Sequence, residues 1–168
     1  MKKILVVLTA LLMAACGEQE PAQPETREPA KAQQHASADD KVGSKLLEVY
    51  KSPTCGCCGD WVDHMKEHGY TVEVHDTDNM QAIKEKAGIL PGGGSCHTAF
   101  IDGYVIEGHV PASDVDRLLA ERPEGKGLTV PGMPVGSPGM EMGDRVDTYD
   151  VLLFDEDGMA VFSHHPGN

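Results

Sequence analysis

The chain between residues 45 and 122 alternates between two hydrophobic periods. Runs that are apolar throughout, or at every second position, are typical of strands, and they occur at 46–50, 71–75, 99–101 and 104–107. Runs with apolar residues three or four positions apart are typical of amphipathic helices, and they occur at 60–68, 80–87 and about 111–122. The predicted order is β-α-β-α-β-β-α, which indicates an α/β domain.

Residues that begin and end helices or turns stand at the boundaries of these runs. Asp78 or Asn79 is suited to cap the second helix, and Gly69 and Gly88 are suited to end the first and the second. The pair Asp102-Gly103 is a strong signal for a two-residue hairpin between the third and fourth strands. The boundary signals therefore agree with the hydrophobic periodicity.

The pattern changes after about residue 128. Residues 130–143 are rich in proline and glycine, so we expect neither a helix nor a central strand there. Two short runs typical of strands follow at 149–154 and 159–163, on either side of a polar turn. We expect the α/β domain to carry a C-terminal Met/Pro/Gly loop and an added β-hairpin.

The first 44 residues differ from the rest in composition. Lys2 and Lys3 precede a short apolar run and small residues before Cys16, which is the pattern of a bacterial secretory signal with a lipobox-like cleavage site. We expect 1–16 to be a lipoprotein signal peptide, with Cys16 as the acylated residue. A plain secretory signal and an uncleaved anchor are the alternatives.

Residues 17–44 contain hardly any large apolar side chain and are rich in Glu, Gln, Pro, Ala and Ser. Such a segment cannot form a core, so it is expected to be a disordered acidic tether. The folded domain is then 45–168, held in the cell envelope by a lipid anchor and facing the periplasm.

The chain is acidic, with 27 Asp and Glu against 14 Lys and Arg and a net charge of −13. Most of this charge falls in residues 45–168. An acidic domain repels a phosphate backbone, which argues against nucleic acid as a partner. The same negative charge favours cations as binding partners.

Three of the five cysteines lie in the segment Cys55-Gly56-Cys57-Cys58, between the first predicted strand and the first helix. Unpaired N–H groups and the positive end of the helix dipole favour a thiolate at such a turn. A C-x-x-C pair at the first turn of a β-α-β unit is typical of a thioredoxin-like redox motif. Cys55 and Cys58 are therefore the predicted redox pair.

The segment Ser95-Cys96-His97-Thr98 follows a glycine loop and leads into the third predicted strand. Thioredoxin-like folds usually carry a cis-proline at this place, facing the cysteines. Here a fourth sulfur and an imidazole are offered instead, which weakens general disulfide exchange and favours metal binding. His97 is expected to be a ligand or to support the ligands.

Copper(I) suits this set of donors because it is soft, prefers thiolates and thioethers, and accepts low coordination numbers. Met133, Met140 and Met142 of the Pro/Gly loop add thioethers, either as ligands or as packing. A structural zinc site fits less well, because Cys57 and Cys58 are adjacent and paired C-x-x-C knuckles are absent. Two inert structural disulfides are the remaining alternative.

The remaining histidines of the domain are expected at the surface. They are His64, His68, His75, His109, His164 and His165. His64 and His68, four apart on a predicted helix, have a spacing that could hold a metal, and so does the adjacent pair His164-His165. Solvated side chains are the simpler interpretation of both pairs.

Three segments occur in the same order as in the CopG-type family of bacterial periplasmic copper-resistance proteins, which this chain resembles over nearly all of residues 45–165. The segments are Tyr50 to Cys58, Ser95 to Ala99, and Val130 to Glu141. The resemblance implies a thioredoxin-like domain in copper defence, with copper ions and other periplasmic copper-handling proteins as partners. It also implies that copper is held by the cysteines at 55, 57, 58 and 96.

We therefore expect a periplasmic protein of copper resistance that holds copper, chiefly Cu(I), in a cysteine cluster and couples binding to thiol/disulfide change. The predicted metal ligands are Cys55, Cys57, Cys58, Cys96, His97, Met133 and Met140. A thiol-disulfide or copper-ion oxidoreductase is one alternative. A structural adaptor domain with inert disulfides is the other.

Overall fold

A computed structural model describes residues 45–168. The predicted signal peptide, Cys16 and the tether lie outside the described residues. The elements of the described part are β1 (Leu46–Lys51), α1 (Gly56–Glu67), β2 (Thr71–Asp76), α2 (Met80–Ala87), β3 (Thr98–Ile101), β4 (Tyr104–Glu107), α3 (Ala112–Glu121), β5 (Gly127–Thr129), β6 (Tyr149–Phe154) and β7 (Met159–His165). Within residues 45–168, no helix has the length and apolar character needed to cross a membrane.

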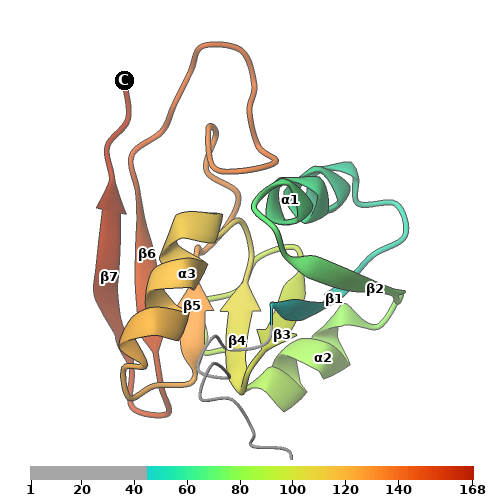
Figure 1. Cartoon of the computed structure of the whole chain (residues 1–168), viewed down its shortest axis with the longest axis vertical. Coiled ribbons are helices and arrows are strands. Elements are labelled where there is room, and N and C mark those ends of the chain that lie inside the picture. Colours follow the sequence, from blue (N-terminus) through green and yellow to red (C-terminus); the bar gives the residue numbers. More distant parts are fainter. Residues whose placement is uncertain (1–44) are drawn as a thin grey trace, which may run out of the picture. The chain divides into compact units, whose positions relative to one another are not determined.

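The strands form one seven-stranded sheet in the order β2-β1-β3-β4-β5-β6-β7 (Figure 1). β1 is parallel to β2 and antiparallel to β3, and β3 is antiparallel to β4. A parallel β-α-β unit followed by an antiparallel hairpin is the arrangement of a thioredoxin-like α/β fold. The predicted fold class is confirmed.

The two faces of the sheet are covered by different helices, because successive side chains of a strand point to opposite faces. Side chains of α1 and α3 pack with those of β1, β3 and β4 in the main core, which includes the fully buried Trp61. Ala87 at the end of α2 packs with Val105 of β4 and Phe154 of β6 in a smaller cluster. The sheet is therefore a central layer between helices.

The start of α1 differs from its prediction. The helix begins at Gly56, four residues before the predicted start, with Cys55 as its N-cap residue. Hydrophobic periodicity did not show this first turn, because Gly56 and Gly59 carry no side chain to contribute to the pattern. Cys57 and Cys58 therefore belong to the helix itself.

The other boundaries agree with the sequence signals. Asn79 caps α2 with its side-chain oxygen, which accepts a hydrogen bond from the Ala82 N–H at 3.3 Å, and Gly88 ends the helix in the left-handed conformation. Asp102 and Gly103 both have positive φ, as a two-residue hairpin requires.

β5 is the element that the sequence analysis missed. It pairs in parallel with β4 and antiparallel with β6, so the β6–β7 hairpin joins the main sheet. The strand has only three residues and begins at Gly127, where a Cβ atom would lie 1.8 Å from the Val105 carbonyl oxygen. Hydrophobic alternation cannot be detected over so short a run.

Candidate metal centre

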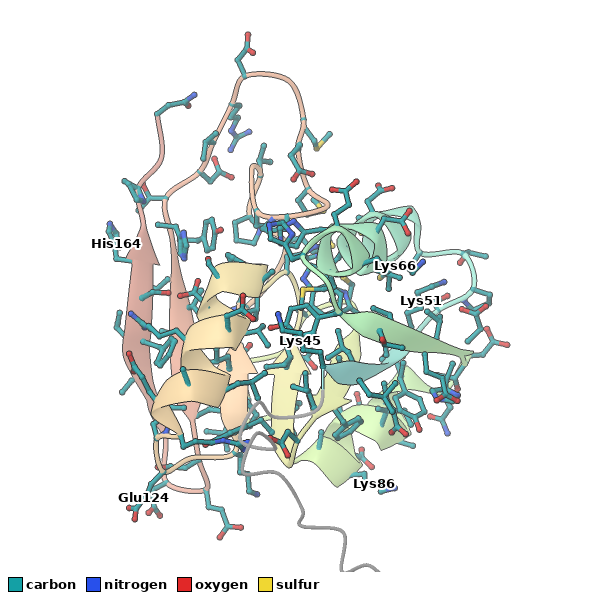
Figure 2. The ribbon with its side chains drawn as sticks, in the orientation of Figure 1. Lys45, Lys51, Lys66, Lys86, Glu124 and His164 are labelled. Carbon is teal, nitrogen blue, oxygen red and sulfur yellow. A yellow bond between two sulfur atoms is a disulfide. The ribbon has the colours of Figure 1, made fainter. Side chains whose placement is uncertain are left out.

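The turn between β1 and α1 carries three cysteines. Cys55 N–H donates to the Ser52 carbonyl at 3.1 Å, and the Cys55 carbonyl accepts from Gly59 N–H at 3.3 Å, which begins the helix. Cys55 and Cys58 are joined by a disulfide with their Cα atoms 5.4 Å apart. Figure 2 shows the side chains of the described residues, with sulfur in yellow. Cys58 is fully buried, whereas Cys55 is half-buried.

All four cysteines of the described residues lie at one place. Cys57 Sγ is 3.6 Å from Cys55 Sγ, and Cys96 brings a fourth sulfur from the segment that leads into β3. The four Sγ atoms lie within 4.8 Å of one another. The structure therefore brings together the four cysteines that were predicted to bind metal, although Cys55 and Cys58 are oxidised in this state.

Cys96 also faces two imidazoles. Its Sγ is 3.3 Å from His97 Nδ1 and 3.0 Å from His109 Nε2. His109 Nδ1 is 2.8 Å from the Pro138 carbonyl oxygen. Because a carbonyl oxygen can only accept, His109 carries its proton on Nδ1 and turns the lone pair of Nε2 towards the sulfur.

The prediction that His109 lies at the surface is wrong, since its side chain is fully buried. The reason is the register of the β3–β4 hairpin, in which Thr98 pairs with Glu107. One residue further, Gly108 N–H donates to the His97 carbonyl. The same pairing places residue 109 opposite Cys96.

Burial sets the protonation of these groups. Burial, and then the neighbouring Cys57, raise the pKa of Cys96 to about 11. Burial also lowers the pKa of His97 well below its usual value, with smaller effects from His109 and Lys84, and it lowers the pKa of His109. At neutral pH the site therefore holds a protonated thiol between two neutral imidazoles.

His97 is held against the core side of the site. Its ring lies 4.4 Å from the Trp61 ring, centroid to centroid, and its side chain is fully buried. Its Nε2 atom is buried without a hydrogen-bond partner. A buried nitrogen without a partner is costly, whereas the other ring nitrogen, Nδ1, faces the Cys96 sulfur.

The Pro/Gly loop crosses the cysteine turn with its backbone. Gly139 has a φ of +80°, and a Cβ atom there would lie 2.6 Å from the Trp61 backbone nitrogen and 2.7 Å from the Cys57 carbonyl oxygen. The loop is visible above the sheet, between β5 and β6, in Figure 1. Met133 is 53% exposed and Met140 is half-buried, and their roles as ligands stay predictions.

The other histidines have different partners. His64 Nε2 accepts a hydrogen bond from the Ala112 N–H at 3.1 Å. At the C-terminus, His164 pairs with Asp150 and His165 with Asp114, so the two adjacent imidazoles serve two different carboxylates.

A family model described as a protein of unknown function, DUF411, matches residues 93–140, which include Cys96, His97 and His109. None of the curated proteins matches the chain.

Two solved structures are similar to the chain. One, titled "Copper resistance protein copG- Form 2", is 45% identical with a TM-score of 0.69, and the match covers 72% of this chain and 98% of that one. The other, "Copper resistance protein copG- Form 1", is 46% identical with a TM-score of 0.69, and the match covers 73% and 98%. The chain therefore belongs to the CopG family of copper resistance proteins.

Proposed function

We propose that this protein acts in copper resistance by binding copper, chiefly Cu(I), in its cysteine cluster. The convergence of four sulfur atoms within 4.8 Å of one another carries this proposal. The titles of the two similar structures, which name copper resistance, support it.

The donor atoms fit copper(I) better than a hard cation. Thiolate sulfurs and imidazole nitrogens are soft or borderline ligands, and the site offers no carboxylate among its closest groups. His109 is also oriented by its bond to the Pro138 carbonyl, as metal-binding imidazoles usually are. Binding at Cys96 must displace the thiol proton, which ties copper affinity to pH.

Copper binding is coupled to the redox state of the cysteine turn. While Cys55 and Cys58 form a disulfide, their sulfurs have no thiolate to donate. Two electrons and two protons from a thiol-class reductant would convert the disulfide to two thiols, which lose their protons to a metal. The oxidised form is therefore a state of low copper affinity.

The remaining parts of the proposal rest on composition. Met133 and Met140 are proposed as thioether ligands from the Pro/Gly loop, and other copper-handling proteins as partners. Cys16 is proposed to carry the lipid that holds the protein in the envelope, with 17–44 as a tether and 45–168 in the periplasm.

The test is a Cu(I) titration of the full chain, reduced and oxidised, with metal per protein measured under anaerobic conditions. We expect more than one Cu(I) per reduced chain, because four sulfurs that can bridge exceed what one two- or three-coordinate ion uses. After oxidation we expect most of the bound copper to be lost. The Cys57→Ser variant should bind fewer ions. A plateau at one ion that Cys57→Ser leaves unchanged would contradict a cluster.

An oxidoreductase role is the second candidate. It is favoured by the free Cys57 thiol, which lies 3.6 Å from a sulfur of the disulfide, within reach for thiol–disulfide exchange. Insulin reduction separates the two roles. Turnover comparable to that of a thioredoxin would favour the oxidoreductase over the copper-binding protein.

A further inference from the structure

The segment that carries Cys96 has no regular secondary structure before β3 begins at Thr98. Its conformation therefore depends on individual hydrogen bonds. A backbone bond from Gly132 N–H to the Gly94 carbonyl at 3.1 Å joins it to the chain after β4. Two side-chain hydrogen bonds do the same: Thr129 Oγ1 donates to the Gly93 carbonyl at 2.5 Å, and Ser95 Oγ donates to the Gly132 carbonyl at 2.5 Å. Neither bond involves a charged group.

A further anchor is the carboxylate of Glu107, the last residue of β4, which is fully buried. Its Oε1 accepts hydrogen bonds from the Ser95 N–H at 2.6 Å and from Lys84 Nζ at 2.5 Å. Its Oε2 accepts from Thr98 Oγ1 at 2.7 Å. One carboxylate thus binds the residues on both sides of the Cys96-His97 pair.

Both oxygens of this buried carboxylate thus have hydrogen-bond partners. Lys84 reaches in from α2, is 17% exposed at its side chain, and also donates to Thr98 Oγ1 at 3.2 Å. Hydrogen bonds to an ionised carboxylate are roughly twice as strong as neutral ones. The ion pair is costly to bury, however, and apolar residues of similar volume are often as stable. A requirement for geometry explains its presence better than a gain in stability.

We propose that Glu107, neutralised by Lys84, is a positioning residue that holds the Cys96 sulfur in the cluster; this rests on the proposed function of that cluster. Among the described residues, Glu107 does not belong to the groups of potential metal ligands around the cysteines. Without the carboxylate, the Ser95 N–H and the Thr98 hydroxyl lose their buried acceptor. The segment then moves to regain hydrogen bonds, and Cys96 moves with it.

The test uses the full chain with the Cys55–Cys58 disulfide intact and measures the rate at which iodoacetamide alkylates Cys96. Mass spectrometry of tryptic peptides separates Cys96 from Cys57. In Glu107→Leu, which has similar volume and no acceptor, we expect Cys96 to react about tenfold faster or more, since hydrogen bonds to charged groups are worth roughly one to two factors of ten. Glu107→Gln keeps an acceptor for Ser95 and should fall between.

A core variant, Leu118→Ala, separates positioning from general destabilisation, because Leu118 is fully buried in α3 and belongs to the main core. Alkylation is compared at temperatures where this variant and the Glu107 variants are equally stable. A rate for Cys96 that is unchanged in Glu107→Leu, or raised as much in Leu118→Ala, would overturn the proposal.

Cu(I) affinity and the thiolate-to-copper absorption bands provide the second measurement. We expect Glu107→Leu to weaken binding and change the bands, while Leu118→Ala keeps the wild-type spectrum. If the wild type binds no copper but Glu107→Leu still speeds alkylation, the proposed function fails and the positioning role stands. If the wild type binds copper and Glu107→Leu has the same affinity and spectrum, the positioning role fails alone.

Discussion

At the scale of single residues, Cys96 joins the two halves of the site. It belongs both to the group of four sulfurs at the α1 turn and to the group that it forms with His97 and His109. Its raised pKa means that a thiol, not a thiolate, meets an arriving ion. The neutral His109 Nε2, 3.0 Å away, is the nearest acceptor for that proton. His109 is therefore placed both to accept a hydrogen bond from the Cys96 thiol and to bind an ion.

His109 shows what single-residue reasoning lacked. Its sequence neighbours give no sign of burial, and an isolated histidine is usually solvated. The hairpin turn at Asp102-Gly103 was nevertheless predicted, and a two-residue turn fixes the register of the strands it joins. Extending that register by the next residues pairs 97 with 108 and 96 with 109. The sequence alone could therefore have placed His109 opposite Cys96.

The pH dependence of stability is expected to include a contribution from His64. Burial, and then the neighbouring His68, lower the pKa of His64, and its neutral Nε2 accepts from the Ala112 N–H at the start of α3. Between the two pKa values the unfolded chain binds more protons at His64 than the folded chain does. The contribution of His64 to stability is therefore fully present above about pH 6.5, and it is lost as the pH falls towards the lower pKa of the folded state. Protonation removes the acceptor of that bond.

The measurement is the free energy of unfolding by urea between pH 7.5 and pH 5. His64→Gln, which keeps an acceptor without titrating, should lose less stability over this range than the wild type. Val62→Ala, a buried neighbour on α1, should lower stability at every pH but keep the wild-type slope. Equal slopes for His64→Gln and the wild type would show that His64 does not contribute.

At the scale of elements, the cysteine turn and the Pro/Gly loop form one unit. Gly139 lies against the first turn of α1, and Pro138 binds His109 through its carbonyl. The sequence predicted that this segment is neither a helix nor a central strand. Composition could not show that Gly139 lies against α1, because this contact is made by backbone atoms.

Gly139→Ala should detach the loop from the cysteine turn. The substitution combines a φ of +80° with a clash of 2.6 Å against the Trp61 backbone nitrogen, and neither backbone can easily yield. We expect a loss of about 1–3 kcal/mol in the free energy of unfolding, together with faster cleavage of the loop by protease in the native state.

Gly132→Ala is the matched control, because it lies in the same loop with a φ of +71° and has open space around the added Cβ. It should cost about 1 kcal/mol from backbone strain alone. If the two variants lose the same stability and are cleaved at the same rate, the contact between Gly139 and α1 contributes nothing.

At the scale of the whole molecule, the seven-stranded sheet connects the site to the C-terminal hairpin. β5 is central to this connection, with β4 on one side and β6 on the other. Val151 of β6 belongs to the same core cluster as Trp61 of α1. The sequence predicted the hairpin but not its place in the sheet, because the three residues of β5 carry no periodic signal.

This connection predicts that the hairpin and the cysteine site unfold together. Gly127→Val should prevent β5 from pairing with β4, because the added Cβ would meet the Val105 carbonyl oxygen at 1.8 Å. Gly158→Val in the β6–β7 turn is the control, because a Cβ added there meets no atom within 4 Å. Overpacking against backbone typically costs about 1–3 kcal/mol, and more where no side chain can move. Thermal unfolding followed by far-UV circular dichroism and by Trp61 fluorescence should give one shared transition, shifted down in Gly127→Val and nearly unshifted in Gly158→Val. Two separate transitions, with Trp61 unaffected by Gly127→Val, would instead show that the hairpin is an independent addition to the α/β core.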